Sequence, residues 1–143
     1  MTKVALLGTC NGSKWRDLVI PRLTIDYFNP VVTDWNEEAQ KREEEEKASA
    51  DVRLYVITSK MTGVYSIAEV VDDSNKYPQK TVLVVANDID GPEFTEFQVK
   101  SLQATMKLVK ANGAKVFNNI DVAITYLNSL SLPDGKSLIL RSE

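Results

Sequence analysis

Arg53-Leu-Tyr-Val-Ile-Thr58, followed closely by Met61-Thr-Gly-Val-Tyr-Ser-Ile-Ala-Glu69, is the stretch that decides the fold of this 143-residue chain. The first segment is a continuous apolar run that predicts a buried strand, and the second predicts a turn leading straight into a helix. A turn rich in Gly, Ser and Thr at the carboxyl end of such a strand can bring its backbone close to a ligand. The helix then carries one carboxylate, Glu69, near its positive terminus. We therefore expect a ligand site at this turn.

The rest of the chain alternates strands and helices in the same way. Ser13 caps a short predicted helix that Pro21 ends or kinks, and Gly113 is the natural end of a long one. The other predicted strands are residues 4–7, 25–28, 81–86 and 115–117, and the other predicted helices are residues 34–50, 63–75, 93–112 and 121–130. This alternation predicts a single α/β domain over residues 1–143, with a mostly parallel, doubly wound sheet of five strands in the order 2-1-3-4-5. Residues 137–140 are expected to add an edge strand or an arm onto a neighbour.

In that strand order the ligand crevice lies at the carboxyl ends of the first and third strands, where the turns at residues 8–13 and 58–66 face each other. The first turn, Gly8-Thr-Cys-Asn-Gly-Ser-Lys14, matches neither a P-loop nor a G-x-G-x-x-G motif, so a tight turn and a ligand contact both stay open. Trp15 could stack on a base and Arg16 could bind a phosphate or carboxylate. A Trp at helical spacing with apolar residues also fits the core.

Composition narrows the chemistry, because the chain has no histidine and one cysteine, Cys10. Without histidine there is no Ser-His or Cys-His pair, so catalysis must use carboxylates, Tyr, Lys or the lone thiol. The net charge of −3 argues against a nucleic-acid partner. No apolar run approaches the roughly 20 residues needed to cross a bilayer, and the start shows no signal-peptide pattern. We therefore expect a cytoplasmic protein without a membrane partner.

The helix predicted at residues 34–50 is strongly charged. Asp34 and Glu37 have the spacing of a capping box, and Glu and Lys or Arg recur four residues apart in the favourable orientation. The run of glutamates at residues 43–46 is most simply a solvated face.

Glu69 has two interpretations. Its helix shows an apolar stripe with Glu69 roughly opposite the centre, which indicates a solvated carboxylate. The stripe consists of Val64, Ile67, Ala68 and Val71. However, Tyr65 and Asp73 share the face of Glu69, and a helix that starts at the carboxyl edge of a sheet can turn its polar side toward the crevice. There an ionised Glu69 could act as a nucleophile.

A family resemblance is carried by Leu7-Gly-Thr-Cys-Asn11 with Trp15-Arg16, by Tyr27-Phe-Asn-Pro30 with Asp34-Trp35, and by the segment from Asp51 to Asp73. At these residues the sequence resembles the nucleoside 2-deoxyribosyltransferase family, most closely its short deoxyribosyltransferase-like branch. The likeness covers roughly residues 3–120. The related 2'-deoxynucleoside 5'-phosphate N-hydrolases share the scaffold. The resemblance implies a flavodoxin-like fold and a homo-oligomer.

The resemblance also implies a glutamate nucleophile that cleaves an N-glycosidic bond through a covalent deoxyribosyl intermediate. This role falls on Glu69, with Tyr65 beside it. A second nucleobase accepts the sugar in transferases, and water does so in hydrolases. The expected partner is a small-molecule nucleoside or nucleotide, and no metal or organic cofactor is needed. The residues expected to bind the substrate are Gly8, Thr9, Cys10, Asn11, Trp15, Arg16, Asp34, Trp35, Thr62, Gly63 and Ser66.

The sequence departs from the family pattern just before Gly63. Ser59-Lys60-Met61-Thr62 stands where family members commonly carry a carboxylate, so no proton donor for the base is evident there. A further family carboxylate lies on the helix before the third strand, where Glu45 is the nearest match and the four consecutive glutamates at residues 43–46 leave the register open. An asparagine that a neighbouring subunit contributes in the family matches Asn118 or Asn119.

These departures leave a second function open, namely a non-catalytic nucleotide-binding or regulatory module on the same scaffold. Flavin binding is a third alternative, which the absence of a recognisable phosphate loop after the first strand disfavours.

Overall fold

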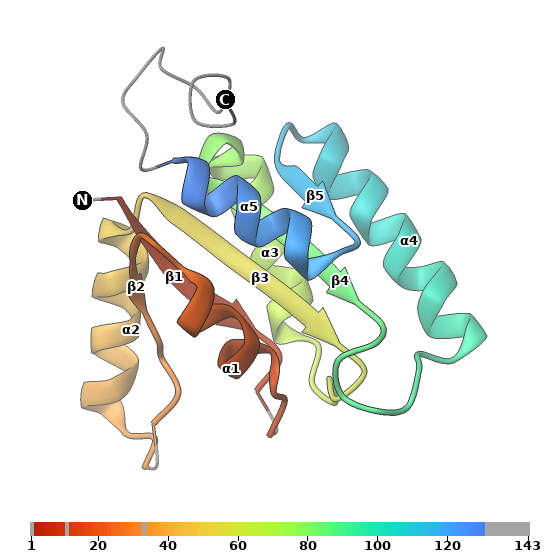
Figure 1. The fold of residues 1–143 in the computed structure, drawn as a ribbon, viewed down its shortest axis with the longest axis horizontal. Coiled ribbons are helices and arrows are strands. Elements are labelled where there is room, and N and C mark those ends of the chain that lie inside the picture. Colours follow the sequence, from red (N-terminus) through yellow and green to blue (C-terminus); the bar gives the residue numbers. More distant parts are fainter. Residues whose placement is uncertain (1, 11, 33, 131–143) are drawn as a thin grey trace.

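Five parallel strands form the central sheet of the computed structural model, which describes residues 2–10, 12–32 and 34–130 (Figure 1). The strand order is β2-β1-β3-β4-β5, and all four neighbouring pairs are parallel. The strands are β1 (Lys3–Gly8), β2 (Asp26–Phe28), β3 (Val52–Thr58), β4 (Thr81–Ala86) and β5 (Lys115–Phe117). This confirms the predicted doubly wound order, which is the flavodoxin-like arrangement.

Helices connect the strands in the predicted alternation. They are α1 (Trp15–Val19), α2 (Glu37–Ser49), α3 (Tyr65–Lys76), α4 (Glu96–Ala111) and α5 (Ile120–Ser129), with short 3₁₀ turns η1 (Ile20–Arg22) and η2 (Pro78–Lys80). Within the described ranges, every helix is too short or too polar to traverse a bilayer. The strand or arm predicted at residues 137–140 lies outside the described residues.

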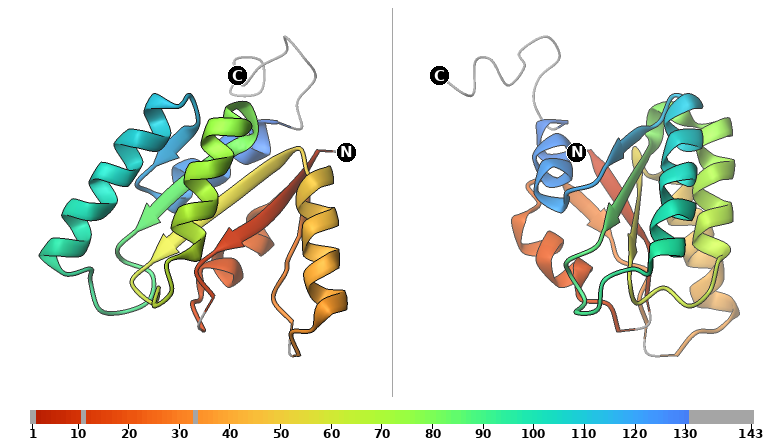
Figure 2. Two further views of the ribbon diagram at one scale, coloured as in Figure 1. Left: turned by 180° about the vertical axis from the view of Figure 1, so that it is seen from behind. Right: turned by 90° about the vertical axis from the view of Figure 1, so that its right-hand side faces the viewer.

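The helices cover both faces of the sheet (Figure 2). On one face α1 and α5 pack against the sheet through Trp15, Val19, Ile124 and Leu127. On the other face α3 and α4 contribute Val70, Leu102 and Val109, and Ala50 packs there just after the end of α2. Because β3 lies in the middle of the sheet, all of its residues are buried.

The starts of three helices differ from the prediction. Asp34 does not cap α2; the Oδ1 of Asn36 accepts from the N–H of Ala39 at 2.8 Å. Lys14 occupies the N-cap position of α1, and the Ser13 hydroxyl accepts only a long bond, 3.4 Å, from the N–H of Trp15. Helix α4 begins three residues later than predicted, since Thr95 forms a capping box with Gln98.

Gly8 ends β1 in a conformation that only glycine adopts readily. Its φ is +113°, and a Cβ at this position would lie 2.3 Å from the carbonyl oxygen of Val56 on β3. That oxygen also accepts from the N–H of Thr9 at 2.9 Å, so it cannot move away without breaking the pairing of the two strands. The close approach of β1 to β3 therefore depends on Gly8.

Gly8→Ala is expected to lower the free energy of unfolding by about 3 kcal/mol, because the clash involves backbone and the φ is unfavourable. Urea unfolding followed by circular dichroism measures the change. Gly63→Ala is the matched control: a Cβ there has open space and the φ is not in the left-handed region, so the change should stay below about 1 kcal/mol. Equal midpoints for the two variants would contradict the prediction.

Candidate active site

A cavity of about 350 Å³ opens beside the carboxyl end of β1, between α2 and α3, and is called here the main cavity. It gathers six of the residues predicted from the sequence: Gly8, Cys10, Arg16, Trp35, Ser66 and Glu69. Five further residues line it: Leu7, Pro30, Val31, Val32 and Glu43. Its walls therefore combine apolar side chains with two carboxylates and one guanidinium. Such a mixture is typical of sites for small organic ligands.

A second, smaller hollow of about 290 Å³, the side cavity, lies between the two predicted turns. It is lined by Gly8, Thr9, Cys10, Met61, Thr62, Gly63, Tyr65 and Ser66. Gly8, Cys10 and Ser66 line both cavities. The turns after β1 and β3 thus face each other, as the strand order predicts.

Two predicted binding residues, Trp15 and Asp34, lie outside both cavities. Trp15 is fully buried in the core, where its Nε1–H donates to the carbonyl oxygen of Thr9 at 2.8 Å, so the core interpretation holds and base stacking by Trp15 does not fit. Asp34 is exposed and lines neither cavity. Asn11 lies outside the described residues.

Arg16 braces the turn that follows β1. Its guanidinium donates to the carbonyl oxygens of Leu6, at 3.2 and 2.9 Å, and of Thr9, at 2.8 Å, and it lies 4.3 Å from the Trp15 ring. Burial lowers the pKa of Arg16, while Cys10 and Glu43 nearby oppose the shift. Because most of its donors are bound to backbone, Arg16 supports the wall of the main cavity and also places a positive charge there.

Asp90 ties a third segment to this turn. It accepts from the hydroxyl of Ser13 and, at 2.9 Å, from the backbone N–H of Lys14. Burial opposes the ionised form, yet the hydrogen bonds from Lys14, Ser13 and Thr58 lower the pKa of Asp90. The hydroxyl of Thr58 also lies 3.2 Å from that of Ser13. The ends of β1, β3 and β4 are therefore joined by one set of hydrogen bonds.

Glu69 lines the main cavity, and its helical phase differs from the prediction. The buried residues of α3 are Val70, Asp73 and Ser74, whereas Val64 of the predicted apolar stripe is 72% exposed. Glu69 therefore lies next to the inner face of α3, and its side chain is only one-fifth exposed. The predicted stripe is partly right: Ile67 and Val71 pack against the core beside Val70, whereas Val64 and Ala68 are exposed.

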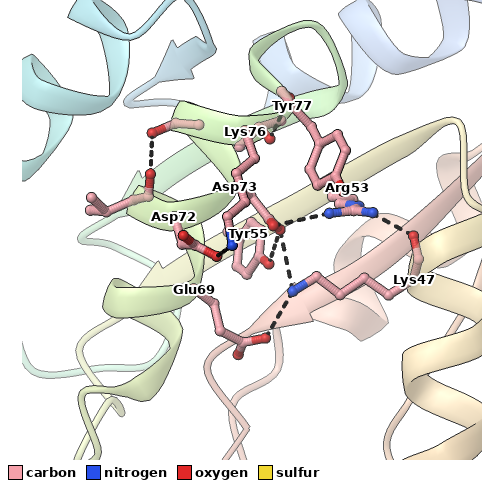
Figure 3. Close-up of polar contacts among 11 residues, drawn as sticks. Lys47, Arg53, Tyr55, Glu69, Asp72, Asp73, Lys76 and Tyr77 are labelled. Carbon is pink, nitrogen blue, oxygen red and sulfur yellow. Dashed lines mark hydrogen bonds and ion pairs between the residues drawn. The ribbon is translucent and has the colours of Figure 1, made fainter.

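Asp73 can be buried because three groups compensate its charge (Figure 3). Its Oδ1 lies 2.9 Å from the Nη1 of Arg53, and its Oδ2 accepts from the hydroxyl of Tyr55 and lies 3.3 Å from the Nζ of Lys47. Burial, together with Asp73, raises the pKa of Tyr55, so the phenol keeps its proton. Lys47 also reaches Glu69, with Nζ and Oε2 3.1 Å apart. A chain of paired charges thus runs from the core to the main cavity.

Glu43 of α2 is the second carboxylate in the main cavity, and sequence reasoning did not single it out from its neighbouring glutamates. The predicted solvated face holds for Glu44 and Glu45, which are exposed, whereas Glu43 and Glu46 are partly buried and Glu46 pairs with Lys3. Glu45, the nearest match to the family carboxylate, instead lies 4.0 Å from Lys41. Two alanines carry the signal that could have identified Glu43: Ala39 of α2 is half-buried, Ala50 at its C-cap is buried, and Glu43 shares their helical phase.

Burial raises the pKa of Glu43, and the negative charge of Glu69 raises it further, although Lys47 and Arg16 partly oppose the shift. The two carboxylates of the main cavity therefore have different surroundings. Glu69 is paired directly with an ammonium, and Glu43 is held closer to its protonated form. Such a split is what separates an acid from a nucleophile in one site.

Tyr65 and the two candidate asparagines are placed less centrally. Tyr65, the first residue of α3, is 75% exposed and lines the side cavity rather than the main one. The Oδ1 of Asn119 accepts from the N–H groups of Asp121 and Val122 and so caps α5. Asn118 lines a separate small cavity beside α4. The contribution of either asparagine to a neighbouring subunit's site stays a prediction.

No protein-family model matches the sequence, and no curated protein matches it significantly. The resemblance to deoxyribosyltransferases therefore stays a hypothesis. What the site can do chemically has to be argued from the geometry of its own residues, above all from the two carboxylates and Lys47.

Proposed function

We propose that this protein cleaves the N-glycosidic bond of a deoxynucleoside or deoxynucleotide, with Glu69 as the nucleophile. The observation that supports this best is the pair of carboxylates in the main cavity, one paired with Lys47 and one half-buried with a raised pKa. A pair of carboxyl groups, one acting as acid and one as carboxylate, is the usual equipment for breaking a glycosidic bond.

The reaction takes two displacements. First, a carboxylate oxygen of Glu69 attacks C1' of the sugar, the C1'–N bond breaks, and the bond's electron pair leaves with the base. Glu43 donates its proton to the departing base, which supplies the acid that the segment before Gly63 lacks. Second, water or another base attacks C1', its proton passes to Glu43, and the C1'–O bond to Glu69 breaks. The enzyme returns to its starting state.

The walls of the main cavity suit such a substrate. Val31, Val32 and Trp35 offer an apolar surface on which a flat nucleobase could lie. Gly8, which lines both cavities, exposes backbone where the sugar would pass. The volume of about 350 Å³ falls in the range of small-molecule sites.

A chromatographic screen tests the proposal. The common deoxynucleosides and their 5'-monophosphates are incubated with the protein, with and without a free acceptor base, and released or exchanged base is measured. Product that rises in proportion to enzyme concentration supports the proposal. Exchange that needs the acceptor base identifies a transferase, and release without it identifies a hydrolase. No product from any substrate would refute the proposal.

A non-catalytic nucleotide-binding module is the second candidate. The observation that favours it is the ion pair between Glu69 and Lys47, because a carboxylate held by an ammonium is a weaker nucleophile. This candidate expects nucleotides to raise the melting temperature while no base is released during long incubation. Base release that scales with the amount of enzyme excludes it.

Glu43→Gln is expected to lower kcat about a hundredfold for an ordinary purine deoxynucleoside, because glutamine cannot give a proton to the base. The loss should be far smaller for 7-methyl-2'-deoxyguanosine, whose cationic base leaves without protonation. The activity of the wild type should also fall as pH rises through the raised pKa of Glu43, because Glu43 can act as an acid only while it is protonated. Glu43→Gln should lack this alkaline limb. Equal losses with both substrates would contradict the acid role.

A further inference from the structure

Lys47 is held at both ends. Its backbone carbonyl oxygen accepts from the Nε of Arg53 at 3.2 Å, and its ammonium lies 3.3 Å from Asp73 and 3.1 Å from Glu69 (Figure 3). The side chains of Lys47 and Glu69 are each only one-fifth exposed, so water screens their interaction incompletely. A lysine fixed in this way holds its ammonium beside the carboxylates of Glu69 and Asp73.

The charge of Lys47 is more important to Glu69 than to Asp73. Asp73 already has the guanidinium of Arg53 at 2.9 Å and the hydroxyl of Tyr55. For Glu69, by contrast, the hydrogen bond and the ion pair found among the described residues both come from Lys47. The buried group of Asp73, Arg53 and Tyr55 therefore serves to hold the ammonium against Glu69.

The geometry points to Lys47 as a positioning residue that acts through Glu69 in the second displacement, an inference that rests on the proposed function. When the C1'–O bond of the covalent intermediate breaks, its electron pair returns to the Glu69 carboxylate, which leaves as an anion. The ammonium of Lys47 lies where that negative charge develops and stabilises it. In the first displacement the Glu69 carboxylate becomes a neutral ester, so the negative charge that Lys47 stabilises is lost. Lys47 thus favours release of the sugar over its capture.

If Lys47 assists the second displacement more than the first, its removal has a kinetic signature that loss of a purely structural residue does not produce. In Lys47→Met the first displacement should proceed while the second slows, so the covalent deoxyribosyl-enzyme accumulates. The kcat is expected to fall about 10- to 100-fold, the typical effect of removing an adjacent charge. KM should fall with it, because an accumulating intermediate lowers both constants. Loss of packing alone would lower stability and leave the ratio of the two displacements unchanged.

The test combines pre-steady-state base release with intact-protein mass spectrometry, using the common deoxynucleosides and their 5'-monophosphates. Lys47→Met should release a burst of about one base per enzyme and carry the mass of a deoxyribosyl group. Lys47→Arg, which keeps the charge, should turn over within about threefold of wild type without the added mass. Lys41→Met on the exposed side of α2 is the control and should behave as wild type. Circular dichroism checks that each variant is folded, and Lys47→Gln replaces Lys47→Met if the latter is not.

The outcomes separate the two proposals. An active wild type whose folded Lys47→Met variant shows neither a burst nor the added mass would overturn the role of Lys47 and leave the proposed function standing. A wild type that releases no base from any substrate would overturn both. A burst with the added mass in Lys47→Met, absent from Lys47→Arg, establishes the inference.

Discussion

Replacing Glu69 by Gln is expected to lower base release at least about a thousandfold, because the amide is a poor nucleophile and the covalent route is lost. Glutamine keeps the size of the side chain, and Lys47 keeps Asp73 as a partner, so the fold should be little affected. The measurement is single-turnover release of base from the best substrate of the screen. Intact mass should show no deoxyribosyl adduct on this variant.

A control variant and a chemical rescue test whether the loss comes from the missing nucleophile. Glu45→Gln removes an exposed carboxylate of α2 that lies outside the main cavity, and it should keep full activity. Glu69→Ala with added azide should recover part of the activity and yield a glycosyl azide, since azide can occupy the space of the missing carboxylate. Base release by Glu69→Gln at the wild-type rate would remove Glu69 from the mechanism.

Asp73→Ala is expected to lower the free energy of unfolding by about 3 to 5 kcal/mol, the second large effect. The substitution leaves the guanidinium of Arg53, only 6% exposed, without its carboxylate, and leaves the buried hydroxyl of Tyr55 without its acceptor. Burying a charge without its partner is among the most costly changes that a single substitution makes. Urea unfolding at neutral pH measures the loss.

The neighbouring residue provides the control. Asp72 lies 3.1 Å from Lys76, but both side chains are more than half exposed, so Asp72→Ala should change the free energy of unfolding by less than about 0.5 kcal/mol. The double variant Asp73→Ala with Arg53→Met should lose less than the sum of the single losses, because no buried charge is then left unpaired. Strict additivity would contradict the pairing of Asp73 with Arg53.

Much of the fold could be predicted because its signals are local. The apolar runs that became β3 and β4 have the composition of buried parallel strands, and the intervening helical segments leave a doubly wound order as the natural arrangement. Helix starts were less predictable, since several side chains compete for the same backbone groups. Asn36 caps α2 although Asp34 has the spacing of a capping box, which a pattern of residue types cannot distinguish.

The site was predictable where it is made of turns and unpredictable where two helices meet. Gly8, Cys10 and Ser66 follow from the strand order, because the order decides which turns face each other. Glu43 and Lys47 are four residues apart, which is the spacing of an ion pair along one helix, yet the ammonium of Lys47 contacts Glu69 of α3. That contact depends on the rotation of both helices. The buried face of α3 includes Asp73 as well as Val70, which the pattern of apolar residues alone does not indicate.

One wall of the main cavity comes from the connection between β2 and α2. Pro30, Val31, Val32 and Trp35 line the cavity, and the N–H of Val31 bonds to the Oδ1 of Asn29 at 3.1 Å, which turns the chain locally. Neither carboxylate belongs to this connection, because Glu43 and Glu69 are anchored on helices. Related chains could therefore diverge in ligand preference by exchanging a few loop residues, and a library randomised at these four positions would sample new specificities while the reactive groups stay in place.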